Sequence, residues 1–185
     1  MTAPLADAIR ARQEADCVAD QDQVEAAIAR LAEEISRRLE NTNPLIYVVM
    51  NGGLVVAGQL LPHLGFPLEV AYLHATRYGH ALKGALLDWR VRPTQDLRGR
   101  TILVLDDILD EGHTLAAIMD HLRGEGAERV YSAVLVDKQH TRKAWPGMRA
   151  DFTGLDVPDR FLFGYGMDYK GYWRNAPGIF AVKGT

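Results

Sequence analysis

The segment 101–115, TILVLDDILDEGHTL, constrains the fold of this chain more than any other. Its continuous apolar run, residues 102–105, is typical of a strand that is buried on both faces of a parallel sheet. Three acidic residues follow directly, Asp106, Asp107 and Asp110. The pattern therefore predicts a buried strand that ends in an acidic loop.

A turn is expected at residues 111–114, and an amphipathic helix should begin at Leu115 and end at Gly124 or Gly126. In open α/β sheets such strand-to-helix loops hold ligands, and a helix N-terminus attracts an anion. Because acids do not attract a phosphate, the loop indicates a ligand that carries both a phosphate and hydroxyl groups, together with a divalent cation.

The same order of strand, glycine turn and helix occurs earlier in the chain. Residues 45–50 are expected to form a buried strand, Gly52-Gly53 a turn and residues 54–64 a helix. Taken alone, the glycine pair indicates a tight turn as readily as a ligand contact. Residues 68–75 and 130–136 should form two further buried strands. This alternation predicts an α/β fold with a doubly wound, mostly parallel sheet and right-handed crossovers.

The remaining segments flank this core. Residues 4–15 and about 20–41 are expected to form helices, the second starting at a capping box of Asp20 and Gln23. The polar stretch 76–93, with a short strand near its end, is interpreted either as a lid or as an ordinary surface hairpin.

Length and composition limit the function. A chain of 185 residues with 48% hydrophobic and 24% charged residues is expected to form one soluble domain. The net charge of −3 provides no general attraction for nucleic acid or for a membrane. The single cysteine, Cys17, cannot form an internal disulfide, and the start of the chain lacks an apolar signal segment. A cytoplasmic protein is expected.

Several common active-site motifs are absent from the sequence. Gly112-His113-Thr114 lacks the lysine of a Walker A loop, and no Gly-x-Gly-x-x-Gly follows the first strand. No Gly-x-Ser-x-Gly elbow exists, and the six histidines show no metal-ligand spacing. These absences argue against kinase, dehydrogenase, acyl-transfer and zinc-enzyme functions.

The segment 101–115 instead resembles the signature of the type I phosphoribosyltransferases, in which apolar, acidic, glycine and hydroxyl positions coincide over about a dozen residues. Further segments are similar to those of the hypoxanthine-guanine phosphoribosyltransferases: residues 50–53 (MNGG), 77–78 (RY), 136–138 (VDK) and 161–169 (FLFGYGMDY). The similarity is expected to run from about residue 45 to 182 and to exclude the N-terminal helices.

The resemblance implies a magnesium-dependent purine-salvage transferase. It would join hypoxanthine or guanine to phosphoribosyl pyrophosphate (PRPP), giving IMP or GMP and pyrophosphate. The chain is then divided into an N-terminal helical extension (1–41), a core (42–140) and a C-terminal hood with the last strands (141–185). The resemblance also implies a homodimer or a homotetramer.

Residue roles are carried over in the same way. Asp110 would be the acid/base at purine N7, with Arg77 and Tyr78 in a flexible loop. PRPP would contact Asn51, Gly52, Asp106, Asp107, Glu111, Gly112, His113, Thr114 and Arg174. The purine would contact Lys138, Phe161, Leu162 and Asp168. Magnesium would be held by Asp106, Asp107 and Asp168.

Three residues depart from the family pattern: Asn51 replaces a frequent lysine, Arg77 a serine, and Glu111 a small or hydroxyl residue. In this family the peptide bond that enters the position of Asn51 is often cis.

Each assignment also has a plainer interpretation. The acid pair is compatible with a solvated loop, Lys138 with a surface lysine and Phe161 with the core. At the level of function, the alternatives are a xanthine-preferring phosphoribosyltransferase and a nucleotide-sensing regulator built on the same fold.

Overall fold

A six-stranded sheet forms the centre of the computed structural model, which describes residues 4–77 and 87–185. Its strand order is β4-β3-β2-β5-β6-β7, and the five strands other than β4 are parallel. β4 pairs antiparallel with β3 at one edge. The strands are β2 (Leu45–Val49), β3 (Glu69–Arg77), β4 (Leu87–Val91), β5 (Thr101–Leu109), β6 (Arg129–Gln139) and β7 (Phe152–Pro158). The predicted doubly wound, mostly parallel α/β sheet is confirmed.

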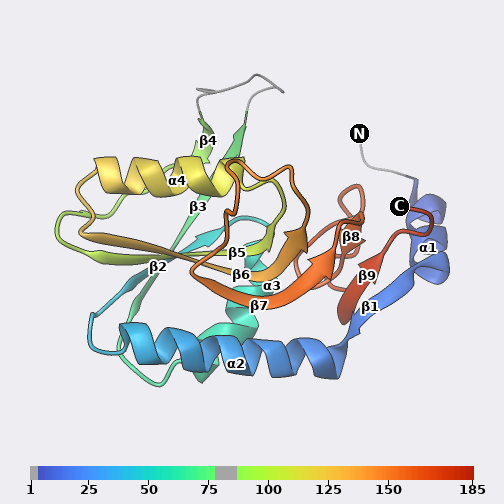
Figure 1. Cartoon of the computed structure of the whole chain (residues 1–185), viewed down its shortest axis with the longest axis horizontal. Coiled ribbons are helices and arrows are strands. Elements are labelled where there is room, and N and C mark those ends of the chain that lie inside the picture. Colours follow the sequence, from blue (N-terminus) through green and yellow to red (C-terminus); the bar gives the residue numbers. More distant parts are fainter. Residues whose placement is uncertain (1–3, 78–86) are drawn as a thin grey trace.

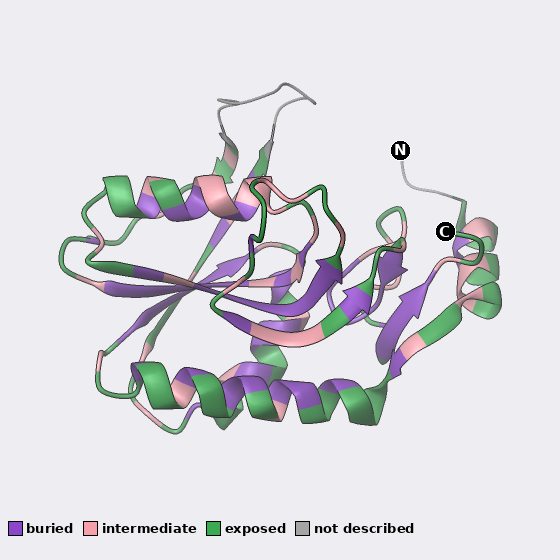
Figure 2. Cartoon of the chain, in the orientation of Figure 1, coloured by how far each residue is buried: buried purple, intermediate pink, exposed green. Residues whose placement is uncertain are grey.

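Helices cover both faces of this sheet (Figure 1). One face carries α2 (Gln21–Leu39), α3 (Gly53–Leu60) and the 3-10 turn η1 (Leu61–His63), and the other carries α4 (His113–Gly124). The helices turn buried residues toward the sheet and exposed residues outward (Figure 2). Consecutive residues of β2 show why its sequence is wholly apolar: Ile46 and Val48 enter one core, while Tyr47 and Val49 enter the other.

A smaller sheet lies beside the main one and forms the hood. It consists of β1 (Asp16–Asp20), β9 (Gly178–Ala181) and β8 (Leu162–Phe163), in the antiparallel order β1-β9-β8. The helix α1 (Leu5–Glu14) packs at its outer side (Figure 1). The N-terminal segment was expected to be helical, but it supplies a strand to the hood. β1 has only five residues, most of them exposed, so the sequence shows no periodic pattern that would predict it.

Two predicted boundaries beside the acidic loop were wrong. β5 continues through Asp106 and Asp107 to Leu109, because residues up to Leu109 pair with β6. The following helix begins at His113, with Gly112 as its N-cap, two residues before the expected start at Leu115. The acid pair therefore lies on a strand inside the sheet, and only Asp110 follows the strand.

The capping box predicted at the start of α2 is confirmed, whereas the end of the next helix is not. Asp20 Oδ1 accepts a hydrogen bond from Gln23 N at 2.9 Å, and Gln23 Oε1 accepts one from Asp20 N at 2.9 Å, which completes the capping box of α2. The helix expected at 54–64 ends earlier, at Leu60, because Pro62 lies in the 3-10 turn that follows. Tyr78 and half of the expected polar excursion, residues 78–86, lie outside the described residues. Within the described part of the chain, no helix is long and apolar enough to cross a membrane.

Candidate active site

A cavity of about 610 Å³ opens above the carboxyl ends of β2 and β5 and the start of α4. Parallel sheets place their ligands at this edge. Every residue to which the sequence assigned contact with PRPP lines this cavity: Asn51, Gly52, Asp106, Asp107, Glu111, Gly112, His113, Thr114 and Arg174. The fold thus brings residues from four separate segments to one place.

A second cavity, of about 190 Å³, adjoins the first. Its lining includes all four residues predicted to contact the purine: Lys138, Phe161, Leu162 and Asp168. Asp107, Ile108 and Asp110 line both cavities, so the two spaces meet at the end of β5. Of the predicted flexible-loop residues, Tyr78 lies outside the described part of the chain, and Arg77 is described only as the last residue of β3.

The neighbouring carboxylates of Asp106 and Asp107 are held close together, and Asp107 N donates a hydrogen bond of 2.9 Å to Asp106 Oδ1. Burial raises the pKa of Asp106, and the charge of Asp107 raises it further. Burial also raises the pKa of Asp107, although the hydrogen bond with Asp106 and the positive charge of Arg174 act in the opposite direction. The buried carboxylate of Asp107 and the half-buried one of Asp106 are stabilised by a bound cation or by hydroxyl donors.

Glycines make this close packing around the acids sterically feasible. A Cβ atom added at Gly52 would overlap the Asp107 carboxylate, and one added at Gly166 would overlap the carbonyl oxygen of Gly52. The Met50–Asn51 peptide bond is cis, as the resemblance implied. The glycine turn after β2 therefore packs directly against the acids of β5, which favours the ligand-contact interpretation of Gly52 over a simple turn.

The N-terminus of α4 forms the opposite wall of the larger cavity. Gly112 adopts φ +82° at the N-cap, and an added Cβ would lie 2.5 Å from the sulfur of Met148. The backbone N–H groups of a first helical turn lack intrahelical partners and favour a negative charge. This end of α4 is therefore suited to binding a phosphate.

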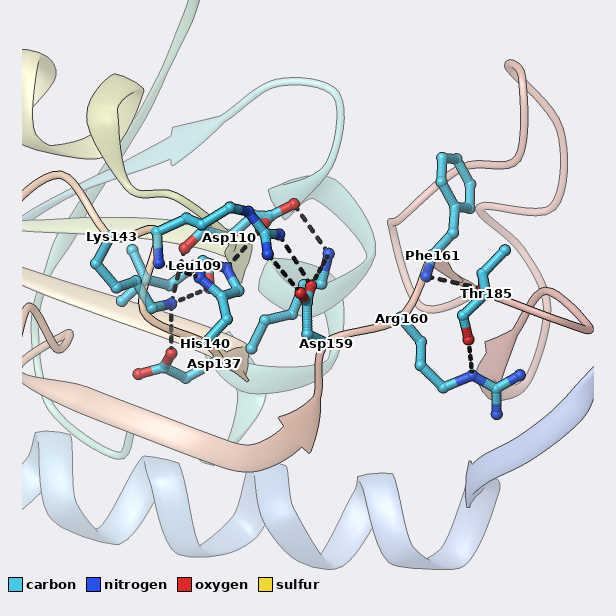
Figure 3. A network of polar contacts seen from close by, with 11 residues as sticks. Leu109, Asp110, Asp137, His140, Lys143, Asp159, Arg160, Phe161 and Thr185 are labelled. Carbon is cyan, nitrogen blue, oxygen red and sulfur yellow. Dashed lines mark hydrogen bonds and ion pairs between the residues drawn. The ribbon is translucent and has the colours of Figure 1, made fainter.

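Asp110 lies at the junction of the cavities, between two hydrogen-bond donors (Figure 3). Lys138 Nζ is 3.0 Å from its Oδ2, and His140 Nε2 is 2.8 Å from its Oδ1. Burial acts to raise the pKa of Asp110, but the hydrogen bonds and charges of these two neighbours outweigh it, so the pKa lies below its usual value. Asp110 is thus an ionised carboxylate at neutral pH.

Lys138 also lies 3.4 Å from Asp159 Oδ1, and Asp159 accepts two hydrogen bonds from Arg142, of 2.7 and 3.1 Å. The hydrogen bonds from Arg142 lower the pKa of Asp159. Among the described residues, Asp110, His140 and Asp159 form a group of possible metal ligands. The ammonium of Lys138 forms ion pairs with both carboxylates of this group, so a cation there would have to displace it.

Arg174 and Asp168 were predicted to act separately, on pyrophosphate and on magnesium. In the structure they form an ion pair, and Arg174 also donates to the carbonyl oxygen of Gly166. The other oxygen of Asp168 accepts a hydrogen bond of 2.6 Å from Gly171 N. Arg174 thereby links the hood to the turn at Gly52, because Gly166 packs against that turn.

Several residues of the site were not predicted from the sequence. His74 and Arg90 line the larger cavity, and burial together with the charges of Arg90 and Arg174 lowers the pKa of His74. His140 follows Lys138 by two residues, and this spacing was a usable signal, since alternate residues of a strand share a face. Asp159 is distant in sequence from its partners, and no local pattern pointed to it.

Lys143, also missed, connects two strand ends (Figure 3). Its Nζ lies 2.7 Å from Asp137 Oδ1 and donates hydrogen bonds of 2.8 and 2.7 Å to the carbonyl oxygens of Leu109 and Asp110. The Lys143 side chain is 7% exposed, and that of Asp137 is fully buried. This ion pair fixes the backbone of Asp110 relative to β6.

A parallel sheet that ends in an acid pair beside a helix N-terminus is typical of α/β enzymes that hold a phosphorylated sugar. The family described as "Phosphoribosyl transferase domain" matches residues 14–170. The hypoxanthine-guanine phosphoribosyltransferase of Bacillus subtilis is 32% identical over 88% of this chain and 90% of its own length. The hypoxanthine-guanine-xanthine phosphoribosyltransferase of Tritrichomonas foetus is 30% identical over 89% of each chain.

Among solved structures, a hypoxanthine-guanine phosphoribosyltransferase of Bacillus anthracis superposes with a TM-score of 0.80 at 26% identity, covering 90% of this chain and 96% of that one. The chain belongs to the hypoxanthine-guanine phosphoribosyltransferase family, and it is a phosphoribosyltransferase enzyme of the purine-salvage type. The family match begins at residue 14 and includes α2, so the expectation that the N-terminal segment carries none of the likeness was wrong.

Replacement of Lys143 by methionine should lower the free energy of unfolding by about 3 kcal/mol, because it leaves the buried charge of Asp137 without its closest partner. Arg149 Nε, 3.2 Å from the other oxygen of Asp137, limits the loss. Urea denaturation measures it. The matched control is Arg123→Met, which removes an exposed ion pair on α4 and should cost less than about 1 kcal/mol. Equal losses in the two variants would contradict the structural role of Lys143.

Proposed function

We propose that this enzyme transfers the phosphoribosyl group of PRPP to N9 of hypoxanthine or guanine, forming IMP or GMP and releasing pyrophosphate. The observation that carries the proposal is the junction of the two cavities at Asp107, Ile108 and Asp110. The larger cavity has the acids and the helix N-terminus that a ribose phosphate requires. The smaller one is lined by an aromatic ring, Phe161, and by a lysine, Lys138, which are groups that can bind a 6-oxopurine.

In the larger cavity, Asp106 and Asp107 accept hydrogen bonds from the ribose hydroxyls, and the turn 111–114 at the start of α4 binds the 5′-phosphate. Glu111 is compatible with this role because its side chain is exposed and lies 3.9 Å from His113 Nε2. The backbone of Asn51 and Gly52, together with Arg174, faces the pyrophosphate.

The carboxylates of Asp106, Asp107 and Asp168 are hard oxygen donors, and the burial of the first two fits Mg²⁺ as the cation. When it is bound, magnesium neutralises charge on the departing pyrophosphate. Asp168 becomes available to it when Arg174, its partner in the structure, turns toward an anionic substrate.

In the smaller cavity, Phe161 stacks on the purine ring. Its side chain is 49% exposed and is supported at its edge by Tyr169, 6.0 Å away between ring centres, so one face is free for a ligand. Backbone groups of Leu162 and Asp168 read the edge of the purine. Lys138 donates one of its three N–H groups to Asp110 and forms an ion pair with Asp159, and it can donate another N–H to the 6-oxo group.

Asp110 then accepts the proton of purine N7 as N9 bonds to C1 of the ribose and the bond from C1 to the pyrophosphate oxygen breaks. Its lowered pKa keeps the carboxylate ionised and able to accept this proton.

The direct test is a competition assay. Hypoxanthine, guanine, xanthine and adenine are supplied together with PRPP and magnesium, and the nucleotide monophosphates are separated and quantified. We expect IMP and GMP, little product from adenine, and loss of all product after chelation of magnesium. Predominant formation of xanthosine monophosphate would favour the xanthine-preferring alternative, and a lack of product from every 6-oxopurine would overturn the proposal.

Asp110→Asn should lower kcat by about 10²- to 10⁴-fold and leave the KM for PRPP nearly unchanged, because the amide cannot accept the N7 proton. Steady-state kinetics of IMP formation measure both constants. Asp120→Asn, on the exposed side of α4, is the control and should keep wild-type kinetics. Turnover near the wild-type value in Asp110→Asn would refute the acid/base assignment.

Gly52→Ala should lower kcat/KM for PRPP by about 100-fold, because the added methyl group displaces the Asp107 carboxylate from the cavity. Gly58→Ala is the matched control: this glycine lies in α3, and an added Cβ there meets open space. The control should keep wild-type activity and gain about 0.5–1 kcal/mol of stability. If both variants were fully active, the close packing of Gly52 on Asp107 would be irrelevant to function.

Several large apolar side chains are exposed on the sheet face that carries α3. Val70 and Tyr72 of β3 are 52% and 55% exposed, and they pair with the β2 residues that form the core beneath α3. Leu54, on α3, is 56% exposed. We propose that these apolar side chains, on the sheet face that carries α3, are covered in a homodimer or homotetramer of a cytoplasmic enzyme. Light scattering should then give two or four times the chain mass of 20.5 kDa.

A further inference from the structure

His140 is buried beside the proposed acid/base. Its side chain is 4% exposed, and its Nε2 lies 2.8 Å from Oδ1 of Asp110. Neither the family motifs nor the proposed reaction assigns it a role. A histidine in this position has two possible actions: it exchanges a proton with Asp110, or it holds the carboxylate in place.

The second nitrogen of the ring distinguishes these actions. The backbone N–H of Arg142 donates a hydrogen bond of 3.1 Å to His140 Nδ1. Nδ1 must therefore carry a lone pair, and in the neutral ring the proton is on Nε2. His140 then donates to Asp110 and has no lone pair with which to take its proton. The hydrogen-bond network thus assigns the ring as a fixed donor.

Other groups around Asp110 further restrict the orientation of its carboxylate (Figure 3). Lys138 holds Oδ2 from the side of the smaller cavity, and His140 holds Oδ1 from the side of the loop that follows β6. Asp159 binds Lys138, and Arg142 binds Asp159. Two donors on different oxygens fix the rotation of a carboxylate about its Cβ–Cγ bond, which a single donor does not.

We propose that His140 is a positioning residue for the transfer reaction, which, through its Nε2–H bond to Oδ1, keeps Oδ2 of Asp110 beside Lys138 in the purine cavity. This inference rests on the proposed function, in which Asp110 accepts the N7 proton. Loss of the donor lets the carboxylate rotate away from N7 while the PRPP site, formed by other residues, remains intact.

The first test compares His140→Ala with His140→Gln. The amide nitrogen of glutamine reaches the place of Nε2, so Gln preserves the donor and Ala removes it. We expect kcat to fall about 10- to 100-fold in the alanine variant and to recover for the most part in the glutamine variant, with the KM for PRPP unchanged in both. His63→Ala, in η1, is the control and should retain wild-type kinetics.

Melting curves separate this effect from misfolding. If His140→Ala does not fold, His140→Phe, which fills the space of the ring without an N–H group, takes its place. Full activity of the donor-free variant, or equal losses in the glutamine and donor-free variants, would overturn the positioning role.

A double variant connects the effect to Asp110. Because His140 acts only through that carboxylate, Asp110→Asn/His140→Ala should be no slower than Asp110→Asn alone, whereas independent roles would multiply the two losses. If Asp110→Asn itself retains turnover, the proposed function fails at its acid/base step. If Asp110→Asn is slow while the donor-free His140 variant is not, only the positioning proposal fails.

The tautomer of the His140 ring can be measured directly. In ¹⁵N spectra of the ring at neutral pH, Nε2 should appear as the protonated nitrogen and Nδ1 as the nitrogen with the lone pair. The reverse assignment would overturn the inference.

Discussion

The burial of β5 on both of its faces is the constraint that places the groups of the active site. The strand pairs with β2 and β6 along its edges, and its alternate residues fill two separate cores, so it has no freedom to slide or to turn. Asp106 and Asp107 belong to the carboxyl end of this strand, so the same pairing fixes their positions before any ligand binds. Preorganised charge of this kind is the main device by which enzymes stabilise a transition state.

Beyond the end of β5, hydrogen bonds from polar side chains and from the loop after β6 fix the position of the chain. Asp110 lies after the strand, where ladder hydrogen bonds no longer hold the chain. Lys143 binds the carbonyl oxygens of Leu109 and Asp110, and Ala144 N donates a hydrogen bond of 2.7 Å to that of Glu111. The loop after β6 thus fixes the backbone of the loop after β5, while His140 of the same loop holds the Asp110 side chain. A buried ion pair contributes little net stability compared with apolar packing. The Asp137–Lys143 pair is therefore better explained by its role in fixing the loop after β5.

The sequence predicted the parts of the fold that have a periodic or compositional signal. The buried strands, the capping box of α2, and the residues that line both cavities follow from apolar runs, from Asp20 and Gln23, and from the family motifs. It did not predict where β5 ends, because Asp106 and Asp107 are polar and only their pairing with β6 keeps them in the strand. It also missed β1, whose partner β9 is more than 150 residues away in the chain, and the contacts of His140, Lys143 and Asp159. The bonds of His140 and Lys143 to the end of β5, and the contact of Asp159 with Lys138, join residues that are distant in sequence. No local pattern encodes these contacts, although the two-residue spacing of His140 from Lys138 was a usable signal.

In the hood, contacts between residues distant in sequence orient Phe161, the proposed purine-stacking residue. Phe161 is exposed on one side, and its position depends on Tyr169, whose hydroxyl donates a hydrogen bond of 3.1 Å to Asp7 on α1. Trp173 Nε1 donates one of 2.6 Å to the carbonyl oxygen of Ala8, and the Arg12 guanidinium lies 3.7 Å above the ring of Phe180. The region matched by the family begins at residue 14, so the contacts of Asp7, Ala8 and Arg12 come from outside it. An exposed aromatic ring has little packing of its own to orient it, and here a helix from the opposite end of the chain supplies that support.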